Sequence, residues 1–109
     1  MEKNRHKILE IIKEEVSRVP GVSSFARFDS DEKGYATTDK VEEAVEFFKD
    51  DFENKIIIHV TILSNINIKN LAEEVQEHLK LRIDKLLDYI DEYQIDLYVE
   101  GIKSKTLNN

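Results

Sequence analysis

The stretch from residue 66 to residue 93 constrains the fold more than any other part of the chain. Apolar residues recur in it at steps of three and four, which places them on one stripe of an α-helix: Leu71, Ala72, Val75, Leu79, Ile83, Leu86 and Ile90. No proline or glycine interrupts the run. Asn67 can cap its N-terminus, because its side-chain oxygen accepts a free N–H of the first turn. The pattern predicts a helix of roughly 24 residues, about 36 Å long, against which the other elements pack.

The composition is typical of one globular domain with a charged surface, since 40% of the 109 residues are hydrophobic and 36% are charged. Cysteine is absent, which excludes disulfides and thiolate chemistry. The net charge of −7 opposes binding to nucleic acid or to an anionic membrane surface. No apolar run approaches the ~20 residues of a membrane span, and the charged N-terminus is unlike a signal peptide. We therefore expect a cytoplasmic protein without nucleic-acid binding or membrane insertion.

The first half of the chain mixes helix, strand and loop signals. Residues 6–19 place apolar side chains on one helical face, and Pro20-Gly21 ends that helix. Residues 22–28 predict a short strand, and the polar segment 29–38 predicts a loop. Residues 40–52 fit two interpretations. Helical spacing with a capping box favours a helix slightly, but the segment also reads as a strand that enters a hairpin turn.

The second half of the chain carries the clearest strand, at residues 55–63, where every second residue from Ile56 to Ile62 is apolar and β-branched. Its other face, with Ile57, His59 and Thr61, is only partly apolar, which is typical of a sheet with one solvated side. Residues 94–102 alternate as a last strand, and residues 103–109 predict a frayed tail. The chain thus predicts an α+β fold of order α-β-β-β-α-β. Its sheet would be mixed or antiparallel, with roughly three or four strands and both helices on one face.

Three short motifs occur in this order along the chain: VPGV at residues 19–22, Asn67-Ile68 before LAEEVQ at residues 71–76, and LYVEGI at residues 97–102. Together they resemble the alkaline shock protein family of bacterial general stress proteins. The resemblance implies a β-hairpin before the long helix, in which residues 45–49 pair with residues 55–60. It also implies a non-enzymatic protein linked to stress and envelope homeostasis, similar to scaffolds that associate with membrane partners. A glycine that the family has between the long helix and the last strand is missing here.

Residue types that carry catalysis or bind metals show no recognisable pattern. His6, His59 and His78 lack the spacing of metal ligands. The segment DSDEKG at residues 29–34 resembles the start of a calcium loop but has lysines where oxygen ligands are needed. The acidic pairs Asp50-Asp51 and Glu73-Glu74 are interpreted as solvated charges. We therefore expect no catalytic residue, no metal and no cofactor.

Two apolar groups lie outside the predicted core stripe. One, on the long helix, either widens the core contact or forms a partner surface if the helix protrudes: Leu81, Leu87 and Tyr89. The other is expected to pack in the core or the hairpin rather than to form an exposed anchor: Phe47, Phe48 and Phe52.

These patterns favour a non-catalytic, stress-response-type protein that acts through protein–protein association. It would be a homo-oligomeric scaffold or adaptor, which reaches the membrane only peripherally through a membrane protein. The alternative hypothesis is a small-ligand-binding or metabolic regulatory module, which requires a concave pocket of about 300 Å³ or more with convergent polar groups.

Overall fold

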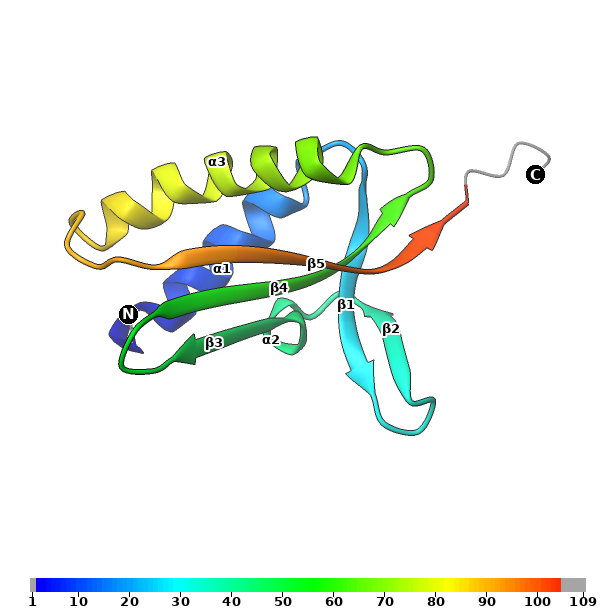
Figure 1. Ribbon diagram of the computed structural model, residues 1–109, viewed down its shortest axis with the longest axis horizontal. Helices are drawn as coiled ribbons and strands as arrows, with labels where there is room; N and C mark the ends of the chain where they lie inside the picture. The colour runs from blue at the N-terminus through cyan, green and yellow to red at the C-terminus, as the bar shows by residue number, and fades with distance from the viewer. Residues whose placement is uncertain (1, 105–109) are drawn as a thin grey trace.

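The computed structural model describes residues 2–104, which form a mixed five-stranded sheet with α1 and α3 packed on one face (Figure 1). The elements in chain order are η1 (Glu2–Asn4), α1 (Arg5–Val16), β1 (Val22–Asp29), β2 (Gly34–Thr38), α2 (Val41–Ala44), β3 (Val45–Lys49), β4 (Asn54–Leu63), α3 (Ile68–Leu86) and β5 (Gln94–Lys103). The α+β class is confirmed. The sheet has five strands rather than three or four.

β4 is the centre of the sheet, because three strands pair with it. β5 runs parallel along one edge of β4. The other edge is shared, since β3 pairs antiparallel with residues 54–58 and β1 pairs antiparallel with residues 60–62. His59 therefore stands where this edge of β4 changes its partner strand. From that junction the β1–β2 hairpin extends away from the rest of the sheet (Figure 1).

The core lies between the helices and one face of the sheet. Four residues of β4 are fully or almost fully buried there: Ile56, Ile58, Val60 and Ile62. They pack with the predicted stripes of α1 and α3, including Ile8, Ile12, Val16, Leu71, Val75, Leu79 and Ile83. Each such side chain contributes about 1.5–3 kcal/mol on leaving water, so this apolar layer fixes which face of every element turns inward.

α3 begins where the sequence predicts but ends early. The Asn67 side-chain oxygen accepts a hydrogen bond from the backbone N–H of Asn70 at 3.1 Å, which confirms the N-cap. The helix has 19 residues, or about 28 Å, instead of roughly 24 residues.

The end of α3 is a Schellman turn built without glycine. The N–H of Tyr89 donates to the carbonyl of Asp84, and the N–H of Asp88 donates to the carbonyl of Lys85. Asp88 and Tyr89 have left-handed φ angles of 54° and 59°, which glycine adopts most easily. The turn stops the helix although the apolar spacing runs on, and Ile90 is consequently exposed rather than part of the stripe.

Two segments differ from the sequence-based expectations. Residues 29–38 are not a simple loop, because Gly34–Thr38 forms β2, which pairs with β1 from Asp29↔Gly34 to Phe25↔Thr38. In residues 40–52 each interpretation holds for a part: Val41–Ala44 is a short helix and Val45–Lys49 is a strand. The β3–β4 hairpin that the resemblance implies is present, with Val45 opposite Ile58.

The expected frayed tail falls largely on residues 105–109, which lie outside the described residues, while Lys103 belongs to β5. Within residues 2–104, none of the helices has both the length and the apolar character that crossing a bilayer demands.

Candidate functional site

The three residues expected either to widen the core contact or to form a partner surface lie in different environments in the structure. Leu81 and Tyr89 are 75% and 74% exposed, whereas Leu87 is buried in the core. Leu87 is the C-cap of α3 and its N–H bonds to the carbonyl of Ile83, so the helical backbone continues to Leu87 and places it on the same buried face as Ile83. The alternative that Leu87 widens the core contact is therefore correct for this residue. The exposed set is Leu81, Tyr89 and the 78% exposed Ile90, which we call the α3 end patch.

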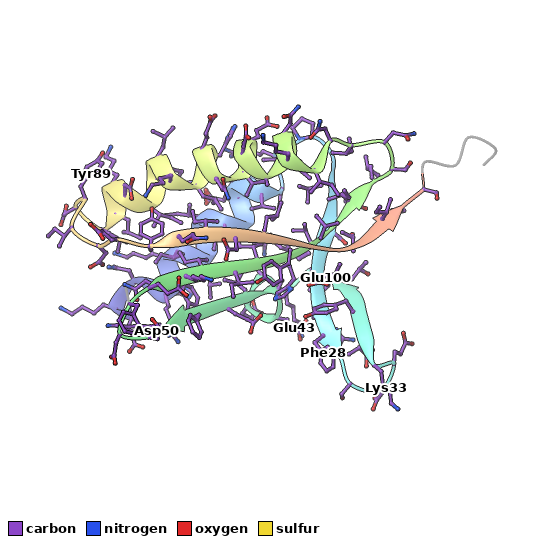
Figure 2. All side chains as sticks on the ribbon, in the orientation of Figure 1. Phe28, Lys33, Glu43, Asp50, Tyr89 and Glu100 are labelled. Atoms are coloured by element: carbon purple, nitrogen blue, oxygen red, sulfur yellow. The ribbon has the colours of Figure 1, made fainter. Side chains whose placement is uncertain are left out.

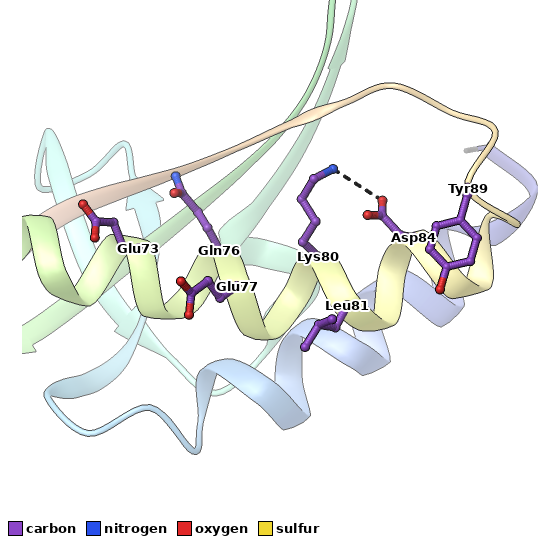
Figure 3. A pocket seen from close by; sticks show the side chains of 7 residues that line it. All are labelled: Glu73, Gln76, Glu77, Lys80, Leu81, Asp84 and Tyr89. Carbon is purple, nitrogen blue, oxygen red and sulfur yellow. Dashed lines mark hydrogen bonds and ion pairs between the residues drawn. The ribbon is translucent and has the colours of Figure 1, made fainter.

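A groove of about 650 Å³ runs along α3 beside this patch (Figure 3). It is lined by Glu73, Gln76, Glu77, Lys80, Leu81, Asp84 and Tyr89. All of them belong to α3 or to the turn after it, so the groove has a single wall. The Asp84 carboxylate in this groove is held in place, because it pairs with Lys80 at 3.4 Å and accepts a hydrogen bond from the hydroxyl of Tyr93 at 2.7 Å. Burial and the Asp84 carboxylate raise the pKa of Tyr93, which keeps it a donor.

The three phenylalanines of the hairpin do not share one environment. Phe47 packs against the core, and the guanidinium of Arg5 lies 4.8 Å from the centre of its ring. Phe48 is half exposed and Phe52 is almost fully exposed in the turn between β3 and β4. The expectation of core or hairpin packing is therefore wrong for Phe52. Asp50 orders that turn, since its side chain accepts the N–H groups of Phe52 and Glu53 at 2.8 Å each.

A second cluster, which the sequence did not predict, lies on the sheet face opposite the helices. His59 is only 5% exposed there. Its Nδ1 lies 2.5 Å from a carboxylate oxygen of Glu100, and its Nε2 lies 2.6 Å from one of Glu46. The ring stacks on Tyr35 at 5.1 Å and meets the Tyr98 ring edge-on at 5.4 Å. We call these five residues the His59 cluster.

The strand register explains how the cluster forms. Tyr98 is paired with His59, and the register between β4 and β5 shifts after the pair formed by Val60 and Val99. Glu100 is the extra residue of this bulge, which directs it to the open face beside His59. Burial, together with the charges of Glu100 and Glu46, raises the pKa of Tyr35, so its ring stays neutral against the imidazole.

The two carboxylates of the cluster lie at opposite nitrogens of one ring, so they cannot share a metal ion with it. In residues 2–104 no group of three histidine, aspartate or glutamate side chains is arranged to hold a metal. The other histidines lie elsewhere: His6 is 3.2 Å from Glu10 on α1, and His78 is 3.5 Å from Glu15.

The open face also carries a cleft of about 440 Å³ next to the His59 cluster. It is lined by Ser23, Ser24, Thr37, Thr61, Gly101, Ile102 and Lys103. The hydroxyls of Ser24 and Thr61 share a hydrogen bond of 2.6 Å across β1 and β4. Figure 2 shows that this face, marked by Glu100, lies far from the α3 end patch, marked by Tyr89. The molecule thus presents two separate surfaces, one apolar and one polar.

Comparisons of the chain with protein-family models, with curated proteins and with solved structures returned no match.

Proposed function

We propose that this chain is a non-catalytic, stress-response-type protein that acts by associating with other proteins, and first with a second copy of itself. The observation that carries the proposal is the α3 end patch. Leu81 in α3 and Tyr89 in the turn after it stand about three-quarters exposed and line one groove, and Ile90, equally exposed, follows Tyr89, on a chain with 36% charged residues. Exposed apolar side chains rimmed by polar ones are typical of interaction sites.

A second copy is the occupant that suits this surface. The protruding Leu81 and the groove lie on the same face of α3, and a two-fold pair needs one surface that complements itself. Glu77 and Lys85 are both exposed, four residues before and four residues after Leu81. An antiparallel pairing of two α3 helices about Leu81 therefore sets Glu77 of one copy at the height of Lys85 of the other.

Such a pair leaves the open sheet faces of both copies available to further partners, which is what a scaffold or adaptor requires. The resemblance to alkaline shock proteins supports a cytoplasmic role in envelope homeostasis, with peripheral membrane association through a membrane protein. The motifs at residues 19–22, 67–76 and 97–102 carry that part of the proposal.

The test is the molar mass in solution, measured by gel filtration with light scattering over a range of concentrations. We expect the wild-type chain to form dimers, and Leu81→Glu or Ile90→Glu to weaken them roughly 1,000-fold. Each copy then loses about 2 kcal/mol of apolar burial, and the pair loses twice that.

Ile68→Glu is the matched control, because Ile68 is half exposed at the other end of α3 and a glutamate is favourable in a first helical turn. A wild-type chain that stays monomeric at all concentrations contradicts the proposal. Equal effects of all three substitutions contradict it as well. Circular dichroism verifies that each variant is folded.

The small-ligand module remains a second proposal, which the hydroxyl-lined cleft on the open face favours. Its walls come from β1, β2, β4 and β5, unlike the one-walled groove on α3. Titration with glucose and with inorganic phosphate, followed by amide NMR shifts of Ser24 and Thr61, tests it. Localised, saturating shifts that Thr61→Val abolishes support a ligand site, and unchanged spectra at millimolar ligand contradict it.

A further inference from the structure

We propose that the His59 cluster is a proton-dependent clasp that holds the start of β3 to the centre of the sheet and releases it when the cluster loses one proton. This role is independent of the α3 end patch. It uses residues from four strands, namely Tyr35 of β2, Glu46 of β3, His59 of β4, and Tyr98 and Glu100 of β5.

The first step is a count of protons. Both ring nitrogens of His59 lie within hydrogen-bond distance of a carboxylate oxygen, at 2.5 and 2.6 Å. A neutral imidazole has only one N–H and presents a lone pair at its other nitrogen. Two hydrogen bonds therefore require either an imidazolium between two carboxylates or a neutral ring facing one protonated glutamate. In both cases the closed cluster holds one proton more than a neutral ring with two carboxylates.

The second step identifies the contact that opens. The side chain of Glu46 is 64% exposed, whereas that of Glu100 is 18% exposed. When the extra proton leaves, one carboxylate faces a lone pair and is repelled. Water can solvate Glu46 at little cost, but Glu100 is largely enclosed and depends on its hydrogen bond to His59. The remaining proton therefore stays on Nδ1 toward Glu100, and Glu46 turns to solvent.

The third step is the position of the cluster in the sheet. His59 stands between the part of β4 that pairs with β3 and the part that pairs with β1. The side chain of Glu46, which pairs with Ile57 in the β3–β4 ladder, contacts His59, one residue past the last pair of that ladder. Tyr35 at the start of β2 rests on the same ring. Opening the clasp therefore loosens the start of β3, whereas the ring, still bonded to Glu100, keeps its stacking contact with Tyr35.

The direction of the pH dependence follows from linkage. The closed cluster binds one more proton than the open one, so acidity favours the closed form and rising pH favours the open form. The titratable groups that face the ring are Tyr35 from β2, Glu46 from β3, and Tyr98 and Glu100 from β5. Lys55 on the same face of β4 is held by Glu53 and Asp96, and Arg27 of β1 is directed to Asp29 and Glu43.

Hydrogen exchange followed by NMR at pH 5.5 and pH 8.5 tests the clasp, with rates corrected for the intrinsic effect of pH. In the wild-type chain we expect the protection of the β3 amides bonded to β4 to be about tenfold lower at pH 8.5 than at pH 5.5. A decrease of this size corresponds to the loss of one hydrogen bond to a charged group. In Glu46→Gln we expect less than a twofold change, because an amide can accept from an imidazolium and donate to a neutral ring. His78→Gln is the control and should behave as the wild type.

Three results overturn the proposal: equal protection of wild-type β3 at both pH values, a fall in Glu46→Gln as large as in the wild type, or a fall that His78→Gln removes. Ring-nitrogen NMR at pH 8.5 provides a second readout. A neutral His59 protonated at Nδ1 supports the clasp, and protonation at Nε2 overturns the assignment of Glu46 as the contact that opens.

Discussion

Replacing Glu15 by glutamine should weaken the contact between α1 and α3 in a pH-dependent way. Glu15 is buried, and its carboxylate lies 2.8 Å from Arg82, 3.5 Å from His78 and 3.6 Å from Arg18. A hydrogen bond to a charged group is worth about 1.5–3 kcal/mol. Arg82 keeps a second partner, Glu14, at 2.9 Å. Because that contact offsets part of the loss, we expect Glu15→Gln to lower the free energy of unfolding by about 1–2 kcal/mol at pH 7.

The pH dependence has a defined sign. The hydrogen bond from Arg82, helped by His78 and Arg18, holds the pKa of Glu15 below its ordinary value of 4.5. A carboxyl group with a lowered pKa in the folded state stabilises the fold above its ordinary pKa, and this contribution is lost as the pH falls through the folded-state value. The difference between wild type and Glu15→Gln should therefore be complete at pH 7 and should shrink as the pH falls below about 4.

Thermal and urea unfolding, followed by circular dichroism at pH 7 and at pH 3, measure both effects. A loss of 1–2 kcal/mol corresponds to a decrease in Tm of about 5–10 °C for a chain of this size. Glu14→Gln is the matched control, because Glu14 is half exposed and its pair with Arg82 contributes about 0.5 kcal/mol or less. Equal losses in the two variants, or a deficit of Glu15→Gln that is undiminished at pH 3, would refute the reasoning.

Three further substitutions address the backbone and the core, each measured by urea unfolding. Asn67→Ala should cost about 1 kcal/mol because the N-terminal N–H of α3 loses its acceptor, and an unchanged midpoint would argue against the cap. Gly21→Ala should cost about 1–3 kcal/mol, since Gly21 has a φ of 102° and a Cβ would lie 3.1 Å from Ile66; a variant as stable as the wild type would contradict this. Leu87→Glu should unfold the chain by burying a charge, unlike Leu81→Glu, and a folded Leu87→Glu monomer would show that Leu87 is not in the core.

The sequence predicts well those elements that bury one face in the core, because their apolar residues then recur with the period of a strand or a helix. β4 directs every second residue from Ile56 to Ile62 into the core, and the stripes of α1 and α3 follow the helical period, because each has one face in the core. β2 was missed for the opposite reason. It is an edge strand, bonded only to β1, and none of its residues is fully buried. Its sequence therefore carries polar side chains on both faces and reads as a loop.

The two surfaces differ in how far the sequence could predict them. Leu81 and Tyr89 were found because they lie off the apolar stripe. Leu87 lies four residues after the buried Ile83, so the helical period itself places it on the core face. The His59 cluster depends on the register of four strands and on one bulge. Glu46, His59 and Glu100 lie far apart along the chain, so only the pairing of β3, β4 and β5 brings them to one place.

The position of β4 also sets an order of assembly. Its pairing with β3 is local, across a short turn, so this hairpin closes at low entropic cost. Its pairing with β5 is parallel and must wait until α3 has been made and folded back. During synthesis the β3–β4 hairpin therefore leaves the ribosome with the β5 edge of β4 unpaired until Gln94–Lys103 has emerged. β5 is thus the last strand of this sheet to be made, and a nascent chain that stalls before it offers neighbouring chains a bare, isoleucine-rich edge of β4.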